Sequence, residues 1–253
     1  SFYVKFMRYL QPLTPLLMLF GAALLMQLRD RRARLAALLL ILLPTGIYAL
    51  SFMTIYGVDH PWDEASRWVY ANVPEGTLMA SEQWDDALPT TMRVDGQLRR
   101  RAEYRDVQLT WLTGPDELDN EAKLQENLAN LEQAEYVTLM SNRVYGVVPR
   151  TEDRYPLSHV YHQHLFDGTF GFEPVFVNTR MPGLMGVHLL PDSFVWPGLQ
   201  PPQEVTAYLD GFPGLNGGRF DESFTVYDQP LVMIFEKVEQ MTADEMRQQF
   251  PDP

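Results

Sequence analysis

Hydrophobic residues are distributed unevenly along the chain, and two long uncharged stretches lie near its beginning. Residues 35–56 carry no charge over 22 positions. As a helix rising ~1.5 Å per residue they would extend ~33 Å, which is enough to cross a bilayer core of ~30 Å. Residues 10–28 form a second uncharged stretch. The pattern predicts two transmembrane helices, the second with a kink near Pro44.

A short basic segment joins the two stretches. Residues 29–34 read RDRRAR, and short basic loops remain in the cytoplasm. Lipid headgroup binding by these arginines would give the same orientation. Residues 1–56 are therefore expected to form a hairpin in a bacterial inner membrane, with residues 57–253 as an extracytoplasmic domain. The residues expected at the membrane interface are Arg8, Tyr9, Arg29, Arg31, Arg32, Arg34, Trp62 and Trp68.

The hairpin also contains features beyond those that an anchor needs. Small or helix-breaking residues occur at membrane depth, and such residues allow close approach of other helices. They are Gly21, Ala22, Ala23, Pro44 and Gly46. We expect membrane lipid and other integral membrane subunits as partners, with a simple anchor as the alternative. Two long stretches argue against a cleaved signal peptide, and the start at Ser1 within a helix-like stretch predicts a longer parent chain.

Downstream of the hairpin, shorter helical and strand patterns alternate. Apolar spacing such as Leu124, Leu128 and Leu131 is typical of amphipathic helices. The predicted helices are residues 61–71, a segment from 115 onward, and 154–166. The predicted strands are residues 77–81, 107–112, 134–140 and 170–178. We expect an irregular loop over residues 181–218 and a closing hairpin that pairs 224–227 with 231–236. Helix-strand alternation predicts an α/β domain with a small mixed or parallel sheet and flanking helices.

Charge separates the same two parts. The whole chain has a formal net charge of -13, but residues 1–56 hold six basic residues and one acid, whereas the remainder holds 14 basic and 32 acidic residues. The acidic domain argues against nucleic acid as a partner. The chain contains no cysteine, which excludes disulfides, thiolate metal sites and cysteine nucleophiles.

Two groups of residues are candidates for ligand or metal binding. Glu82, Asp85 and Asp86 follow a predicted strand and offer carboxylates for a metal or for acid-base chemistry. We favour a solvated acidic loop there, with the neighbouring Trp84 packed on the domain. His159 and His162 share a helix face, but a metal site needs a third ligand, so surface histidines are favoured. No catalytic residue and no cofactor can be assigned.

Several segments in order carry a family resemblance. They are residues 5–15 (KFMRYLQPLTP), 71–76 (ANVPEG), 82–89 (EQWDDALP), 141–146 (SNRVYG) and 222–230 (ESFTVYDQP). Together they resemble the C-terminal part of bacterial, polytopic, lipid-carrier-dependent glycosyltransferases of the protein mannosyltransferase-like superfamily. The resemblance implies lipid-phosphate-linked sugar donors. It also implies a catalytic Asp in a first extracytoplasmic loop, for which this sequence has no counterpart.

Two hypotheses for function follow. The first is a membrane-anchored domain that is catalytically incomplete as it stands and serves as an accessory or structural subunit of a larger membrane complex, with an energy-converting complex as one candidate. The alternative is the C-terminal portion of an active glycosyltransferase that uses a polyprenyl-phosphate-linked sugar.

Overall fold

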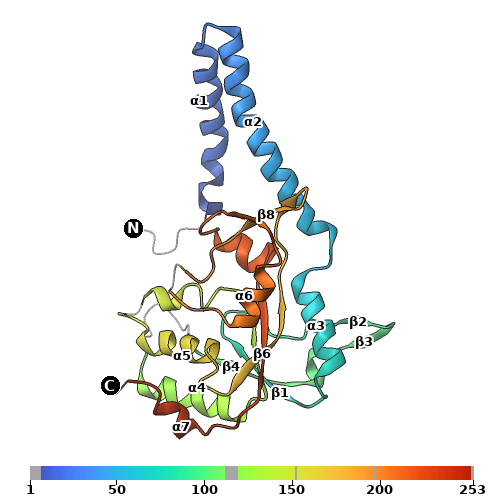
Figure 1. Ribbon diagram of the computed structural model, residues 1–253, viewed down its shortest axis with the longest axis vertical. Helices are drawn as coiled ribbons and strands as arrows, with labels where there is room; N and C mark the ends of the chain where they lie inside the picture. Colours follow the sequence, from blue (N-terminus) through green and yellow to red (C-terminus); the bar gives the residue numbers. More distant parts are fainter. Residues whose placement is uncertain (1–6, 112–118, 152, 196–197, 252–253) are drawn as a thin grey trace.

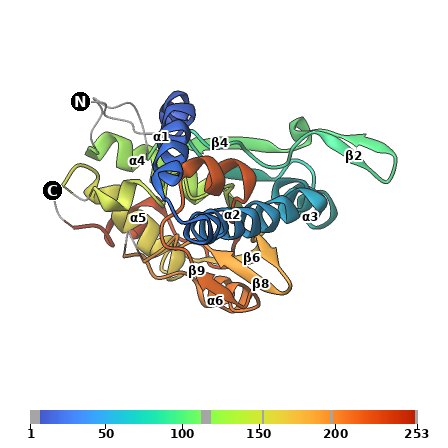
Figure 2. The same cartoon turned by 90° about the horizontal axis from the view of Figure 1, so that it is seen from above.

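A computed structural model describes residues 7–111, 119–151, 153–195 and 198–251 of the chain. These residues form a helical hairpin and a mixed α/β domain, and the hairpin rises from one end of the domain (Figure 1). Viewed along the hairpin, the domain spreads out beneath it on several sides (Figure 2).

The hairpin consists of two helices that run in opposite directions. A 3-10 helix, η1 (Met7–Leu13), leads into α1 (Thr14–Gln27), and α2 (Arg31–Met53) returns to the domain and continues into η2 (Thr54–Gly57). Two helices in this part of the described chain are long and apolar enough to cross a membrane, as the hydrophobic pattern predicts. Pro44 lies inside α2, which remains helical on both sides of it.

A five-stranded sheet in the order β4-β1-β5-β10-β6 forms the centre of the domain. Its strands are β1 (Leu78–Glu82), β4 (Arg105–Leu109), β5 (Tyr136–Leu139), β6 (Phe172–Asn178) and β10 (Val232–Lys237). β4 and β5 both run parallel to β1, whereas β10 is antiparallel to β5 and β6. The sheet is therefore mixed, and the predicted parallel pairing after a helix is confirmed.

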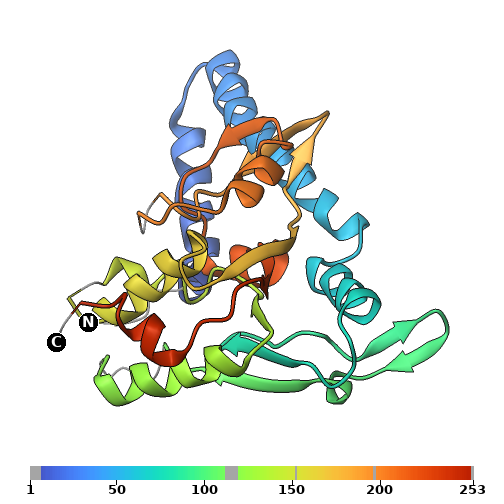
Figure 3. The same ribbon diagram turned by 60° about the horizontal axis from the view of Figure 1, so that its bottom comes forward.

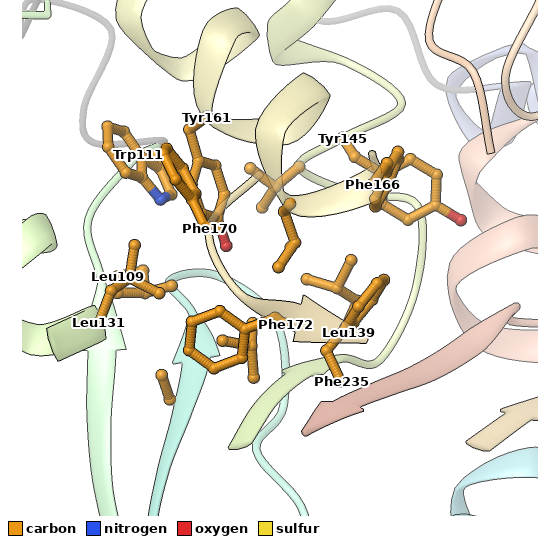
Figure 4. Close-up of a cluster of buried hydrophobic side chains, with 14 of the residues drawn as sticks. Leu109, Trp111, Leu131, Leu139, Tyr145, Tyr161, Phe166, Phe170, Phe172 and Phe235 are labelled. Atoms are coloured by element: carbon orange, nitrogen blue, oxygen red, sulfur yellow. The ribbon is translucent and has the colours of Figure 1, made fainter. Parts of the chain in front are cut away.

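Helices cover both faces of this sheet. They are α3 (Pro61–Asn72), α4 (Glu121–Gln133), α5 (Pro156–Phe166), α6 (Gln203–Leu209) and α7 (Ala243–Arg247), with 3-10 turns η3 (Arg101–Glu103) and η4 (Val148–Arg150). Successive residues of a strand point to opposite faces, so Ala80 joins the core under α4 and α5 while its neighbour Met79 joins the core under α3. Figure 4 shows the aromatic part of the first core, with Trp111, Tyr161 and Phe170 close together.

Two predictions for the second half of the domain are wrong. Residues 181–218 are not one irregular loop, because short strands fit between the prolines and glycines. A second sheet beside α6 consists of β7 (Gly183–Leu184), β8 (Val187–Leu190) and β9 (Gly214–Asn216). Residues 224–227 are not a strand. They belong to a π-helical turn, η5 (Ser223–Asp228), whose Phe224 packs on Phe52 of α2.

Two further differences concern residues 90–120. A small hairpin of β2 (Met92–Val94) and β3 (Gln97–Arg99) was not predicted from the sequence. The predicted helix start near residue 115 falls outside the described residues, and α4 begins at Glu121 with the Asn120 side chain accepting from Lys123 N at 2.9 Å.

Candidate functional site

The carboxyl ends of the three parallel strands meet at one edge of the sheet. β4 follows β1 in this sheet and pairs with it on one side. α4 then leads to β5, which pairs with β1 on the other side. In open α/β sheets, ligands bind outside the carboxyl ends of strands at such a switch in direction. The loops after β1 and β5, residues 83–86 and 140–143, therefore define the candidate site.

Asp85 and Ser141 bring these two loops together. Ser141 Oγ lies 3.0 and 3.1 Å from the two carboxylate oxygens of Asp85, to which it donates, and it accepts from Arg143 N at 3.1 Å. Burial raises the pKa of the Asp85 carboxyl to about 7, the Ser141 hydrogen bond opposes this, and the charge of Glu82 raises it further. A carboxyl that exchanges its proton near neutral pH has the property that a general acid or base requires.

Arg143 connects these two loops to η5 through hydrogen bonds and an ion pair. Its guanidinium donates to Trp84 O and, at 2.6 Å, to Tyr227 Oη, and its Nε lies 3.4 Å from Glu222 Oε1. The guanidinium also lies 5.2 Å from the centre of the Tyr227 ring. Trp84 has a left-handed backbone with φ of 72°, and 57% of the residue is exposed. An exposed tryptophan beside a carboxyl and a cation can pack against the apolar face of a sugar ring while the charged groups bond its hydroxyl groups.

This edge of the sheet lies next to the end of the helical hairpin. Phe224 of η5 packs edge-on against Phe52 near the end of α2, with ring centres 4.9 Å apart. Tyr56 Oη donates to Asp228 Oδ1 at 2.8 Å. Because Tyr227 lies between these two contacts in η5, the candidate site is connected directly to the last turns of α2.

Glu82 is separate from the open part of the site. It is fully buried, and its Oε1 lies 2.8 Å from Nε2 of His162, which is also fully buried. The other ring nitrogen of His162 lies 2.7 Å from Ser158 O. Among the described residues Glu82 Oε2 has no hydrogen-bond partner. The pair joins the end of β1 to α5 inside the core, and because both side chains are fully buried we interpret it as structural.

A buried ion pair between Lys123 and Asp119 lies in the same region. Lys123 Nζ lies 2.8 Å from Asp119 Oδ1 and donates to Trp111 O at 2.6 Å. Ser158 donates to Asp119 from both its backbone N, at 2.9 Å, and its hydroxyl. This network fixes the first turn of α5 against α4 and so supports the position of His162 one turn further along.

The structure corrects the two sequence interpretations of the candidate ligands. The predicted solvated loop is confirmed for Asp86, which is exposed, but it is wrong for Glu82, which is buried. The predicted packing of Trp84 on the domain is also wrong, because this residue is exposed. Surface histidines are wrong for His162, and His159 is half-buried. In the part of the chain that the structure describes, no three His, Asp or Glu side chains are grouped to hold a metal ion.

The residues predicted for the membrane interface have different environments. Trp62 Nε1 donates to Met140 O at 2.9 Å, and Trp68 packs on Phe176 with ring centres 5.6 Å apart. Both tryptophans are half-buried, and their position at a membrane interface stays a prediction. Tyr9 is exposed, and the Arg8 side chain lies outside the described part of the chain.

The basic connection between the helices is shorter than predicted. Only residues 28–30 lie between α1 and α2, and Arg31, Arg32 and Arg34 belong to the first turn of α2. Asp30 caps this helix by accepting from Arg32 N at 3.0 Å, while Arg29 is exposed in the connection. The physical reason is the cap itself, since an aspartate that accepts from the first turn starts a helix at the next residue.

The residues predicted for helix packing are all exposed within the chain. They are Gly21, Ala22, Ala23, Pro44 and Gly46. A Cβ added at either glycine would meet open space. The hairpin itself does not use these positions for close packing.

The fold and site together define a mixed α/β domain joined to two helices long enough to cross a membrane. No known protein family matches the chain, and neither curated proteins nor solved structures include a significant relative.

Proposed function

We propose that the chain is a membrane-anchored α/β domain that acts outside the cytoplasm as an accessory part of a larger integral membrane assembly. In this proposal α1 and α2 cross the bilayer, and their exposed small residues contact further membrane helices. The observation that carries the proposal is the exposure of the hairpin: α1 has no buried residue, and in α2 the buried residue is Ser51.

Photocrosslinking in native membranes tests this function. A crosslinker at Gly21 or Gly46 should join the chain to a larger integral membrane protein. Leu19 is the matched control, because it is exposed and lies about 200° around α1 from Gly21, at ~100° per residue. Crosslinks from both glycines that reach lipid or this chain alone would contradict an accessory role.

The position of the candidate site favours a second function, as the C-terminal part of a glycosyltransferase. Asp85, with a pKa near 7, and the exposed Trp84 lie at the sheet edge that adjoins the end of α2. If α2 crosses the bilayer, this edge faces the membrane surface, where the headgroup of a lipid-linked sugar would lie. Trp84 would then contact the sugar and Asp85 its hydroxyl groups.

Binding of a polyprenyl-phosphate-linked sugar to the detergent-solubilised chain tests the second function. The sugar-bearing lipid should bind more tightly than the same polyprenyl phosphate without sugar, and Trp84→Ala should remove the difference. Leu98→Ala is a matched control, since Leu98 is also exposed but lies on the β2-β3 hairpin. Equal binding of both lipids would contradict a role in sugar recognition.

A further inference from the structure

Two small hairpins in the domain have the same turn geometry but different turn residues. In β2-β3 the two residues between paired Val94 and Gln97 are Asp95 and Gly96, with φ of 49° and 82°. In β7-β8 the corresponding residues are Met185 and Gly186, with φ of 54° and 82°. Positive φ at both positions favours Asn-Gly or Asp-Gly. Asp95 follows this preference, whereas Met185 does not.

Packing within the chain does not account for the methionine. Met185 is 96% exposed, and its neighbour in the hairpin, Val187, is 53% exposed. A left-handed backbone costs free energy in a residue other than Gly, Asn or Asp. The chain therefore has an unfavourable apolar residue at a position where it gains no burial from the domain.

The two hairpins differ in their position relative to α2. β7 packs beside α2, and Gly183 N donates to Thr54 Oγ1 at 3.3 Å. Figure 3 shows the β7-β8 tip next to this helix, whereas β2-β3 extends away from it in Figures 1 and 2. Thr54 lies within the uncharged stretch that ends at Tyr56, so the tip begins at the depth where the proposed span meets the membrane surface.

We infer that the β7-β8 tip inserts Met185 and Val187 into the apolar boundary of the lipid bilayer, as a third attachment point beside α1 and α2. This inference rests on the proposed membrane anchoring. Insertion would bury both side chains in lipid and would prevent the domain from swinging about η2. The sheet edge that carries Asp85 would then keep a fixed orientation toward the lipid headgroups.

Site-specific fluorescence tests the inference cleanly, because the chain contains no cysteine. Single variants Met185→Cys, Asp95→Cys and Leu42→Cys, each labelled with an environment-sensitive dye, are reconstituted into vesicles of phosphatidylethanolamine and phosphatidylglycerol. Leu42 is the reference for the span, since it is exposed in the middle of α2, and Asp95 is the matched hairpin control. Quenching is measured with nitroxides on the lipid acyl chains and with iodide in the water.

The expected result is a blue-shifted emission at residue 185 that the lipid nitroxides quench and iodide does not, with the opposite result at residue 95. In a Met185→Asp background, a label at Val187→Cys should lose much of its quenching by lipid. If residue 185 responds like residue 95 while residue 42 is quenched by lipid, the inference is wrong and the anchoring stands. Protection of residue 185 from both quenchers means cover by protein and also overturns it. If residue 42 is not quenched by lipid, both fail.

Discussion

Replacing Asp85 by Asn should make the domain more stable above neutral pH. The reason is the buried position of the carboxyl, whose pKa rises from 3.8 to about 7. An acid with a raised pKa in the folded state favours folding when it is protonated, so its contribution is fully present below pH ~4 and is lost as the pH rises through ~7. Asparagine carries no charge at any of these pH values, and it can still accept from Ser141.

The size of the effect follows from the shift. About three pKa units correspond to about 4 kcal/mol at ~1.36 kcal/mol per unit, and partial exposure of Asp85 reduces this to about 1–3 kcal/mol. At pH 4 the variant and the natural chain should have nearly equal free energies of unfolding. At pH 8.5 the variant should be more stable by that amount.

The assay is urea unfolding of the detergent-solubilised chain, followed by tryptophan fluorescence at a series of pH values. Asp86→Asn is the matched control, because Asp86 is exposed and adjacent and should change stability by less than about 0.5 kcal/mol. If Asp85→Asn and Asp86→Asn give the same pH profile, the Asp85 carboxyl is not desolvated and its pKa is not raised.

Three further predictions concern the buried pairs and activity. His162→Ala leaves the buried Glu82 side chain without its hydrogen-bond partner and should lower the free energy of unfolding by about 1–3 kcal/mol. Adding Glu82→Met to this variant should recover much of the loss, and no recovery would contradict the structural role. Lys123→Met should likewise cost about 3 kcal/mol, because it leaves Asp119 buried at 1% side-chain exposure, and urea unfolding measures it. Purified residues 1–253 should transfer no sugar from a polyprenyl-phosphate donor, and turnover above a heat-inactivated control would refute this.

Local sequence patterns predicted the helices α3 and α4 and the parallel strands of the central sheet, although they missed the β2-β3 hairpin. α3 has a proline at its start and acids in its first turn, and α4 buries Leu124, Leu128 and Leu131 on one face as their spacing predicts. These features depend on neighbouring residues, so a single sequence contains them. The strand-like residues of η5 were misleading, because they form a helical turn whose Phe224 packs on the distant Phe52.

The candidate site was less predictable, because its contacts join distant parts of the chain. Asp85 and Ser141 are 56 positions apart, and no local pattern indicates that they meet. His162 did leave a signal: it lies among Ser158, Tyr161 and Leu165, which share the buried face of α5. A histidine in the middle of an apolar helix face indicates burial with a partner, and this spacing would have separated His162 from His159.

Cysteine accessibility in spheroplasts tests membrane anchoring most directly. Arg31→Cys lies at the start of α2 and Asp86→Cys lies in the domain, and both positions are exposed. A membrane-impermeant maleimide should label residue 86 in intact spheroplasts and should reach residue 31 only after the inner membrane is opened. Labelling of both residues in intact spheroplasts, or of residue 31 alone, would contradict a hairpin that crosses the membrane with the domain outside.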